Sequence, residues 1–252
     1  MGEKLGTIIL AAGKGTRMKS DLAKVLHPLC GKPLLSYSIG QARQVHSDRT
    51  VIVIGHQADR IREIFRDEDI IFVEQKRQLG TGHAVLQTKG VFRDYQGTVL
   101  VLCGDVPLLK AGTIMAMWKR HMAGAAAVTV LTVVLDDPGG YGRVLTDSSG
   151  KVLRIVEEKD ASDEERRINE INTGIYCFES TFLFENLDRI GNKNAQGEYY
   201  LTDMIEIARR KGLTAQNYRA NDPTEVMGIN SVADLERAAR FVQSHENRKP
   251  RP

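Results

Sequence analysis

Short apolar runs rich in β-branched residues alternate with helical patterns through the first half of the chain, and this alternation constrains the fold more than any other feature. Strands that are almost wholly apolar are typical of a parallel sheet covered by helices on both faces, because neither side of such a strand meets water. The predicted strands span 5–12, 50–55, 69–73 and 98–103, and the predicted helices span 33–44, 57–66, 82–89 and 110–123.

The second half of the chain has the same kinds of element without the regular alternation. No linker separates the halves, so we expect one α/β domain over residues 1–245, with a Rossmann-like three-layer α/β/α arrangement around a mixed, mostly parallel sheet. The polar, basic tail 246–252 is expected to be disordered. The elements predicted here are strands at 127–135 and 171–178, a hairpin of 142–146 with 152–157, a charged helix or loop at 160–167, and helices at 200–211 and 232–244.

Composition and charge exclude several classes of protein. The formal net charge is +3 over 252 residues, which gives no argument for a nucleic-acid partner. Three widely spaced cysteines without a CxxC pair argue against a zinc site or a disulfide framework. We find neither a signal-peptide pattern nor an apolar run of the ~18 residues that a membrane span requires. We therefore expect a cytoplasmic protein that acts on small molecules, without a nucleic-acid or membrane partner, and its oligomeric state stays open.

A glycine-rich loop follows the first predicted strand, which ends at Ala12. Ligands of open α/β sheets bind outside the carboxyl ends of the strands. Gly13 and Gly15 let the backbone bring N–H groups close to phosphate oxygens, and Arg17 and Lys24 add positive charge. The loop is neither the P-loop of NTPases nor the dinucleotide-binding GxGxxG pattern, whose third glycine is replaced here by methionine. It nevertheless predicts a phosphate-binding site.

Residues 10–18 (LAAGKGTRM) and 20–27 (SDLAKVLH) together resemble the signature of sugar-1-phosphate nucleotidyltransferases. The similarity covers nearly all of residues 5–240 and is greatest to the uridyltransferase (pyrophosphorylase) domains that make UDP-N-acetylglucosamine in bacteria. The resemblance implies the nucleotide-diphospho-sugar transferase type of sheet and a cytoplasmic enzyme that uses Mg²⁺. It also implies transfer of UMP from UTP to N-acetylglucosamine 1-phosphate, a step toward peptidoglycan precursors.

The resemblance assigns a nucleotide-binding role to several motifs of this chain. Arg17 and Lys24 match the family's catalytic pair that grips the triphosphate. Gln75 matches a glutamine that binds uracil, although on its own it would be an exposed loop residue. Cys103 stands where the family usually has tyrosine, which leaves a backbone contact as its expected role. The remaining matched positions are Leu10, Ala11, Ala12, Gly13, Gly80, Thr81 and Gly104.

The resemblance also implies a metal site and a sugar site. Asp105 matches the catalytic aspartate that binds Mg²⁺, and Asn230 matches the second metal ligand. Without the family pattern, Asp105 would be a turn residue and Asn230 a helix N-cap. The sugar-binding positions are Gly142, Glu157 and Asn172, and the neighbouring Glu158 and Lys159 could instead be a solvated pair.

Other functions on the same fold stay open at this stage. The enzyme could use another sugar 1-phosphate, or dTTP or CTP, because the amide of Gln75 can flip to suit cytosine. A non-catalytic sensor of nucleotide sugars is disfavoured, because the predicted phosphate and metal residues are all present. His27 and His83 lie within motifs and are expected to be structural rather than catalytic. Full-length relatives continue into a left-handed β-helix that acetylates glucosamine 1-phosphate. Hexapeptide repeats are absent here, so we expect no acetyltransferase activity.

Overall fold

The computed structural model describes residues 3–148 and 150–246, and within them it forms one large sheet. The strand order is β11-β7-β10-β6-β1-β4-β5, and β10 runs antiparallel to both of its neighbours while the other pairs are parallel. The strands of this path are β1 (Leu5–Ala11), β4 (Arg49–Ile54), β5 (Ile71–Glu74), β6 (Thr98–Cys103), β7 (Val128–Val134), β10 (Glu170–Glu179) and β11 (Ala215–Arg219). This arrangement confirms the predicted mixed, mostly parallel sheet.

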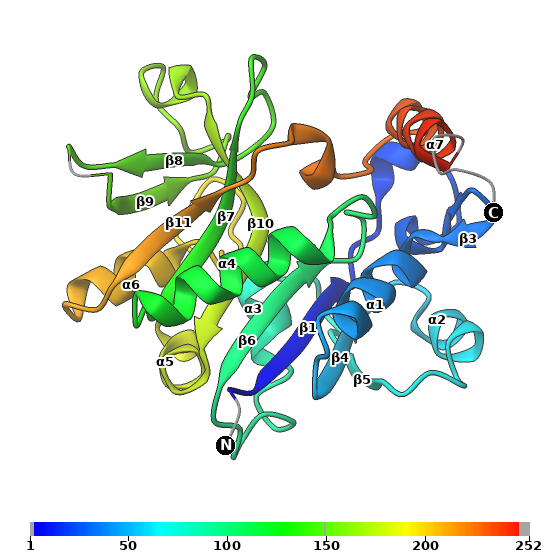
Figure 1. The fold of residues 1–252 in the computed structure, drawn as a ribbon, viewed down its shortest axis with the longest axis horizontal. Helices are drawn as coiled ribbons and strands as arrows, with labels where there is room; N and C mark the ends of the chain where they lie inside the picture. Colours follow the sequence, from blue (N-terminus) through cyan, green and yellow to red (C-terminus); the bar gives the residue numbers. More distant parts are fainter. Residues whose placement is uncertain (1–2, 149, 247–252) are drawn as a thin grey trace.

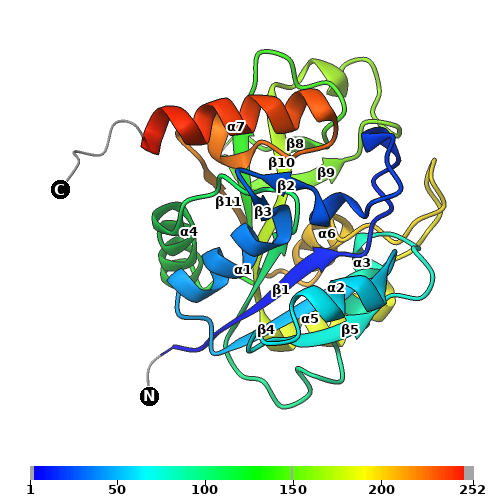
Figure 2. The same cartoon turned by 90° about the vertical axis from the view of Figure 1, so that its right-hand side faces the viewer.

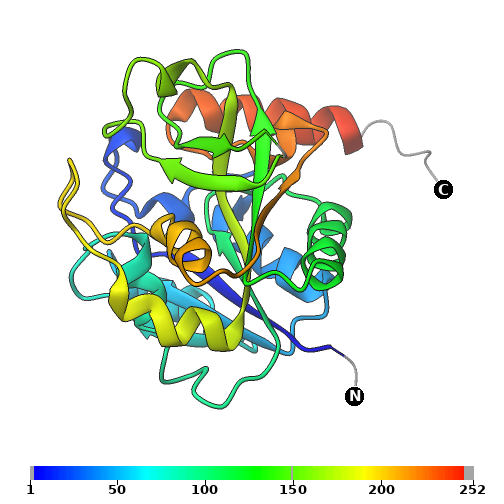
Figure 3. The same cartoon turned by 90° about the vertical axis from the view of Figure 1, so that its left-hand side faces the viewer.

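Helices cover the sheet on both faces. Ile8 and Ile9, adjacent in β1, enter two different apolar cores because successive strand side chains point to opposite faces. Figure 2 looks at the face covered by α1 and α4, and Figure 3 shows α5 and α6 on the opposite side. The first face carries α1 (Leu34–Gln44), α2 (Ala58–Ile64) and α4 (Ala111–Ala123), and the second carries α3 (Thr81–Leu86), α5 (Ser180–Asn186) and α6 (Asp203–Arg210).

The predicted hairpin is present as β8 (Arg143–Thr146) and β9 (Val152–Val156), which pair antiparallel and join the main sheet through β10 (Figure 1). The last helix, α7 (Val232–Glu246), packs through Ala238 in a small third core with Leu29 and Ile229. It extends one residue into the predicted tail, and residues 247–252 lie outside the described part. Among the described residues, no helix has both the length and the apolar character to cross a membrane.

Several elements were not predicted from the sequence. Strand β11 has the polar sequence AQNYR, which lacks an apolar signal because it lies at the edge of the sheet. Helix α5 is only two turns long, and the carboxylate of Glu179 caps it by accepting from the N–H groups of Thr181 and Phe182. The remaining unpredicted elements are β2 (Pro28–Leu29), β3 (Lys32–Pro33) and the 3₁₀ helices η1 (Thr16–Met18), η2 (Lys24–Leu26), η4 (Leu187–Arg189) and η5 (Pro223–Val226). A further 3₁₀ helix, η3 (Glu165–Arg167), lies within the charged stretch 160–167 that was predicted as a helix or loop.

Candidate active site

A cavity of about 290 Å³ lies at the carboxyl ends of β1 and β6, where the sequence predicts nucleotide binding. The two strands are neighbours in parallel register, with Leu10 opposite Cys103, so the loops that follow them meet at one edge. Gly104 lies against this edge, and its N–H donates to the Leu10 carbonyl at 2.9 Å. The predicted residues that line the cavity are Leu10, Ala11, Ala12, Gly13, Lys24, Gln75, Gly80, Thr81, Cys103 and Asp105.

The glycine-rich loop folds back against Lys24. Gly15 has a φ of +66°, a left-handed conformation that disfavours residues with a side chain, and a Cβ there would lie 2.5 Å from the Cβ of Lys24. The N–H of Met18 donates to the Gly15 carbonyl at 2.9 Å, and the Met18 side chain is buried, which anchors the turn. The loop therefore holds the lysine at the mouth of the cavity.

Two cations and two metal-ligand candidates meet at one end of the cavity. Lys24 pairs with the carboxylate of Asp105, and its ammonium also donates to Oδ1 of Asn230 at 3.2 Å. Arg17 donates to the same Asn230 oxygen at 2.8 Å. Four residues that the sequence separates by as many as 213 positions thus form one connected polar cluster.

Asn230 is not the cap of α7, although it precedes that helix. Ser231 takes this role, because its hydroxyl accepts from the N–H of Asp234 at 3.2 Å while the Asp234 carboxylate accepts from the N–H of Ser231 at 2.9 Å. This reciprocal arrangement is a capping box. The Asn230 side chain instead accepts hydrogen bonds from Lys24 and Arg17. The alternative that Asn230 is the N-cap of α7 is therefore wrong.

The oxygens of Asp105 and Asn230 suit a hard divalent cation. Both bind the ammonium of Lys24, so they converge on a single positively charged group. One carboxylate and one amide oxygen match the preference of Mg²⁺ for a few protein oxygens, with waters and phosphates completing the octahedron. The N–H of Ile229 donates to the Asp105 carbonyl at 2.9 Å, which ties the two segments together. The residues present therefore fit a magnesium ion.

Gln75 lies inside the cavity wall rather than on an exposed loop. Its side chain is only 3% exposed, and its backbone N–H donates to the Ile54 carbonyl at 2.8 Å. The side-chain amide nitrogen contacts the Gly80 carbonyl oxygen at 3.0 Å and Nδ1 of His83 at 2.9 Å. The structure therefore brings Gln75 into the wall of the same cavity as Lys24 and Asp105.

The three predicted sugar-binding residues also come together, at the junction of β8, β9 and β10. The N–H of Asn172 donates to the Gly142 carbonyl at 2.8 Å, and a Cβ on Gly142 would lie 3.4 Å from a carboxylate oxygen of Glu157. Burial, reinforced by the nearby carboxylate of Asp160, raises the pKa of Glu157. Glu158, for which the sequence suggested a solvated pair with Lys159, instead forms an ion pair with Arg143 at 2.8 Å.

Cys103 links the candidate nucleotide cavity to this cluster of predicted sugar-binding residues. Its Sγ contacts the carbonyl oxygen of Gly174 at 3.5 Å, at the point where the pairing of β10 shifts between Asn172 and Tyr176. The hydroxyl of Tyr176 and the N–H of Gly174 both donate to Oδ1 of Asn172 at 2.9 Å. Burial, reinforced by the Asp105 carboxylate, raises the pKa of the Cys103 thiol to about 12, so the thiol stays protonated and packs.

Sequence reasoning missed several residues of the cavity wall. Gln78 and Glu198 line it, and Gln78 donates to the Gln75 carbonyl at 3.1 Å. Gln78 lies inside the 75–83 motif and could have been found there, whereas Glu198 lies in an irregular segment whose sequence has no periodicity. The other unpredicted wall residues are Val25 and Ala84.

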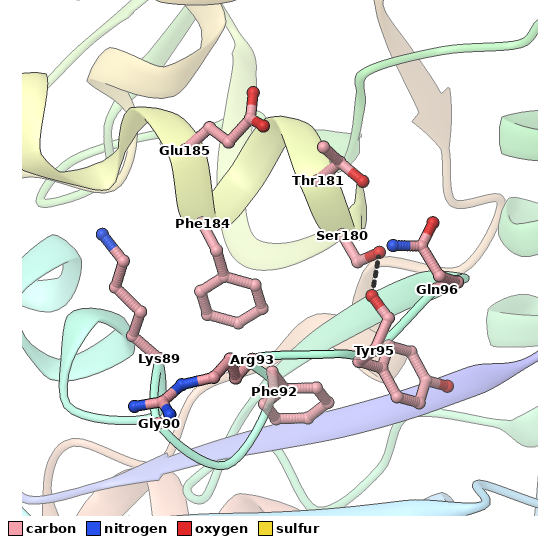
Figure 4. Close-up of a pocket in the computed structure, with 10 residues that line it drawn as sticks. All are labelled: Lys89, Gly90, Phe92, Arg93, Tyr95, Gln96, Ser180, Thr181, Phe184 and Glu185. Atoms are coloured by element: carbon pink, nitrogen blue, oxygen red, sulfur yellow. Dashed lines mark hydrogen bonds between the residues drawn. The ribbon is translucent and has the colours of Figure 1, made fainter.

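A larger cavity, of about 570 Å³, lies away from this site between α5 and the segment around residues 89–96 (Figure 4). Figure 4 shows the rings of Phe92, Tyr95 and Phe184 along it, with Lys89 and Arg93 at one side. Its lining includes no predicted site residue. Most of the predicted nucleotide-binding residues, together with Lys24 and Asp105, instead line the smaller cavity, so size alone does not identify the candidate active site.

Comparison with known proteins agrees with this geometry. The sequence profile of a family described as "Nucleotidyl transferase" matches residues 6–224. This match spans the glycine-rich loop, the 75–83 motif, Asp105 and the predicted sugar-binding residues, and it stops before Asn230. It confirms the resemblance found from the motifs.

Curated relatives match the chain along nearly its whole length. A protein named "Bifunctional protein GlmU" from Geobacter metallireducens is 52% identical over 250 residues, which cover 99% of this chain and 52% of the relative. The protein of the same name from Geobacter sulfurreducens is 52% identical over 96% of this chain and 51% of its own length. The one from Desulfotalea psychrophila is 46% identical over 97% of this chain and 72% of its own length. The chain thus spans about half the length of the first two relatives.

Proposed function

The chain belongs to the nucleotidyl transferase family, and we propose that it transfers UMP from UTP to N-acetylglucosamine 1-phosphate, releasing UDP-N-acetylglucosamine and pyrophosphate. The observation that carries the proposal is the polar cluster of Arg17, Lys24, Asp105 and Asn230 at the mouth of a cavity that also contains Gln75. Triphosphate, metal and base can then occupy one continuous surface. A cytoplasmic location is part of this proposal.

The proposed reaction needs little acid–base chemistry from the protein. An oxygen of the sugar phosphate attacks the α-phosphorus of UTP in line, the new P–O bond forms, and pyrophosphate leaves with the electron pair of the broken bond. The second pKa of a phosphate monoester is about 6, so the nucleophile is already largely dianionic at neutral pH. No general base is therefore required, and positioning and electrostatic stabilisation supply most of the catalysis.

One end of the site stabilises the charge of the triphosphate, and the other end positions the sugar phosphate. The cations Arg17 and Lys24 neutralise the triphosphate as the acceptor anion approaches. The cluster formed by Gly142, Glu157 and Asn172 receives the sugar, with the Glu157 carboxylate and the Asn172 amide available for its hydroxyl and acetamido groups. Cys103 lies between the two ends, since it lines the cavity and its Sγ contacts the Gly174 carbonyl oxygen.

Asp105 and Asn230 are the residues that would hold Mg²⁺. The ion, when bound, supplies positive charge to the phosphate oxygens. Asp105 follows the end of β6, and Asn230 is tied to it through the hydrogen bond from Ile229. The protein therefore contributes two preorganised oxygens, and the substrates contribute the rest of the shell.

A substrate panel tests the proposal directly. Purified protein is incubated with Mg²⁺, each of UTP, dTTP, CTP and ATP, and each of several sugar 1-phosphates, and pyrophosphate release is measured. We expect UTP with N-acetylglucosamine 1-phosphate to be the best pair. Preference for a different pair would overturn the substrate assignment, and failure of every pair to release pyrophosphate would overturn the activity.

A further inference from the structure

We propose that His83 is a positioning residue that selects the nucleobase through Gln75. It holds the Gln75 amide with its oxygen toward the cavity, so that the site takes a pyrimidine that carries a hydrogen on N3 and rejects cytosine. The inference deepens the proposed function and rests on it. His83 does not touch the base, and its influence passes through the glutamine side chain.

Both hydrogens of the Gln75 amide are already used inside the protein. The amide nitrogen lies 3.0 Å from the Gly80 carbonyl oxygen and 2.9 Å from Nδ1 of His83. A primary amide has two N–H donors and one oxygen acceptor. Among the described residues, Oε1 of Gln75 accepts no hydrogen bond, and Gln75 lines the nucleotide cavity. The only hydrogen-bonding group that Gln75 can offer a ligand is therefore an acceptor.

The Gly80 carbonyl is the first of two groups that fix the orientation of the Gln75 amide, because a carbonyl oxygen can only accept a hydrogen bond. Gly80 has a φ of +105°, and a Cβ there would lie 2.6 Å from the Tyr199 carbonyl oxygen. The neighbouring segment is held in place, since the N–H of Tyr199 donates to the Leu79 carbonyl and the N–H of Gly82 donates to the Tyr199 carbonyl, both at 2.8 Å. The Gly80 oxygen is thus a fixed reference point for the amide.

His83 is the second group that fixes the Gln75 amide, provided that its Nδ1 carries no proton. Burial, reinforced by the charge of Arg77, lowers the pKa of His83, so the ring is neutral at neutral pH. The second ring nitrogen lies 3.2 Å from the Gln87 amide nitrogen, which also donates to the His83 carbonyl oxygen at 3.0 Å. The Gly80 carbonyl oxygen already holds the Gln75 amide nitrogen beside Nδ1, and an amide nitrogen can only donate, so we assign Nδ1 as the acceptor from Gln75 and place the ring proton on Nε2.

A flipped Gln75 would lose both interactions. Its oxygen would face the Gly80 carbonyl oxygen and the lone pair on Nδ1 of His83, so two attractions would become two repulsions. Uracil and thymine present an N3–H that the outward Gln75 oxygen accepts, whereas cytosine presents a lone pair at N3 that needs the flipped amide. Leaving one such buried pair unmade costs about 10-fold in an equilibrium constant. The sequence alone left the amide free to flip, and the structure removes that freedom.

Three variants of the full chain test the inference. His83→Phe keeps an aromatic ring but removes the acceptor, His83→Asn retains a side-chain oxygen near the position of Nδ1, and Gln87→Leu removes the partner of the other ring nitrogen. Binding of UTP and of CTP in Mg²⁺ buffer is measured by calorimetry, with kcat and KM from pyrophosphate release and thermal unfolding as a check on folding. For the wild type we expect tighter binding of UTP than of CTP.

For His83→Phe we expect UTP binding and the UTP-to-CTP preference each to fall by about 10-fold, with the change in KM rather than kcat. His83→Asn and Gln87→Leu should stay close to the wild type. Equal binding of UTP and CTP by the wild type, or an unchanged preference in folded His83→Phe, would overturn the inference. If His83→Phe unfolds, loss of the preference in folded His83→Asn would contradict the proposed acceptor role. Wild-type protein that binds UTP selectively but releases no pyrophosphate would overturn the proposed function and leave the role of His83 standing.

Discussion

Lys24 forms an ion pair with Asp105 at the mouth of the nucleotide cavity, and both side chains are less than one-fifth exposed. The same ammonium also donates to Asn230, so it occupies the point on which the two candidate metal ligands converge. The lysine therefore plays two opposing parts. Under the proposed function it would neutralise the triphosphate when that is bound, and it would compete with a divalent cation for Asp105 when the triphosphate is absent.

The first prediction concerns this competition. We expect Lys24→Met to bind Mn²⁺, a spectroscopic substitute for Mg²⁺, about fivefold more tightly than the wild type without nucleotide, because a partly exposed ion pair contributes roughly 1 kcal/mol. Electron paramagnetic resonance of free Mn²⁺ measures this affinity. Lys89→Met is the matched control, since Lys89 pairs with Asp188 elsewhere on the surface. Equal Mn²⁺ affinity in the wild type and Lys24→Met would contradict the prediction that the Lys24 ammonium and the divalent cation occupy the same position.

The second prediction concerns Asp105 itself. Replacing its carboxylate in Asp105→Asn or Asp105→Ala should lower turnover by at least about 100-fold, because metal stabilisation of phosphate charge is worth several kcal/mol. Folding should be preserved, since the side chain lies at the cavity wall rather than in an apolar core. Pyrophosphate release and circular dichroism measure the two effects. Asp94→Asn, an exposed acid outside the site, serves as the control, and normal turnover in Asp105→Ala would refute the assignment.

A third prediction compares two glycines of the N-terminal loop. Gly15→Ala should lower the melting temperature and weaken UTP binding, because a left-handed residue with a Cβ costs about 1–2 kcal/mol and the new methyl group would displace Lys24. A Cβ on Gly13 meets no atom within 4 Å, so Gly13→Ala should leave the melting temperature unchanged. Because Gly13 lines the cavity, that variant should still weaken UTP binding. Equal melting temperatures for both variants would show that the Gly15 conformation is not required.

The fourth prediction is a pH dependence of stability that arises from His121. This histidine is 2% exposed, its Nδ1 lies 2.9 Å from the Thr129 hydroxyl, and burial lowers its pKa to about 4. In the unfolded chain the pKa is about 6.5, so between these two values the unfolded state binds more protons than the folded state. The stability of the folded protein therefore falls as the pH falls through this window.

Urea unfolding at pH 7.5 and pH 5 measures the effect. Between pH 7.5 and pH 5 the free energy of unfolding of the wild type should fall by about 2 kcal/mol more than that of His121→Gln, whose side chain cannot titrate. The difference follows because each unit of pKa shift is worth about 1.4 kcal/mol. Subtracting the variant removes the contribution of the carboxylates that both proteins share. If the free energy of unfolding of the wild type falls no more than that of His121→Gln, His121 is not held neutral by the fold.

Much of the fold follows from local patterns in the sequence. The apolar runs that became β1, β4 and β6 are almost continuous because both of their faces are buried, and the helices between them bring their carboxyl ends to one edge. The loop after β1 and Asp105 after β6 could therefore be placed together from the sequence. Strand β11 could not, because an edge strand with polar residues has no distinctive period.

In the candidate site, too, some features could be predicted from the sequence and others could not. The sequence by itself predicted a phosphate-binding loop after the first strand, and its resemblance to the family implied the metal and sugar residues, since the motifs that carry the resemblance are local in the sequence. Only the tertiary structure decided that Ser231 rather than Asn230 caps α7, which leaves Asn230 to meet Lys24 and Arg17. Only the tertiary structure oriented the Gln75 amide as well, because its two acceptors are set by the packing of Gly80 and His83 around it. A hydrogen bond depends on distance and direction in space, and local sequence periodicity carries neither between residues that meet only after folding.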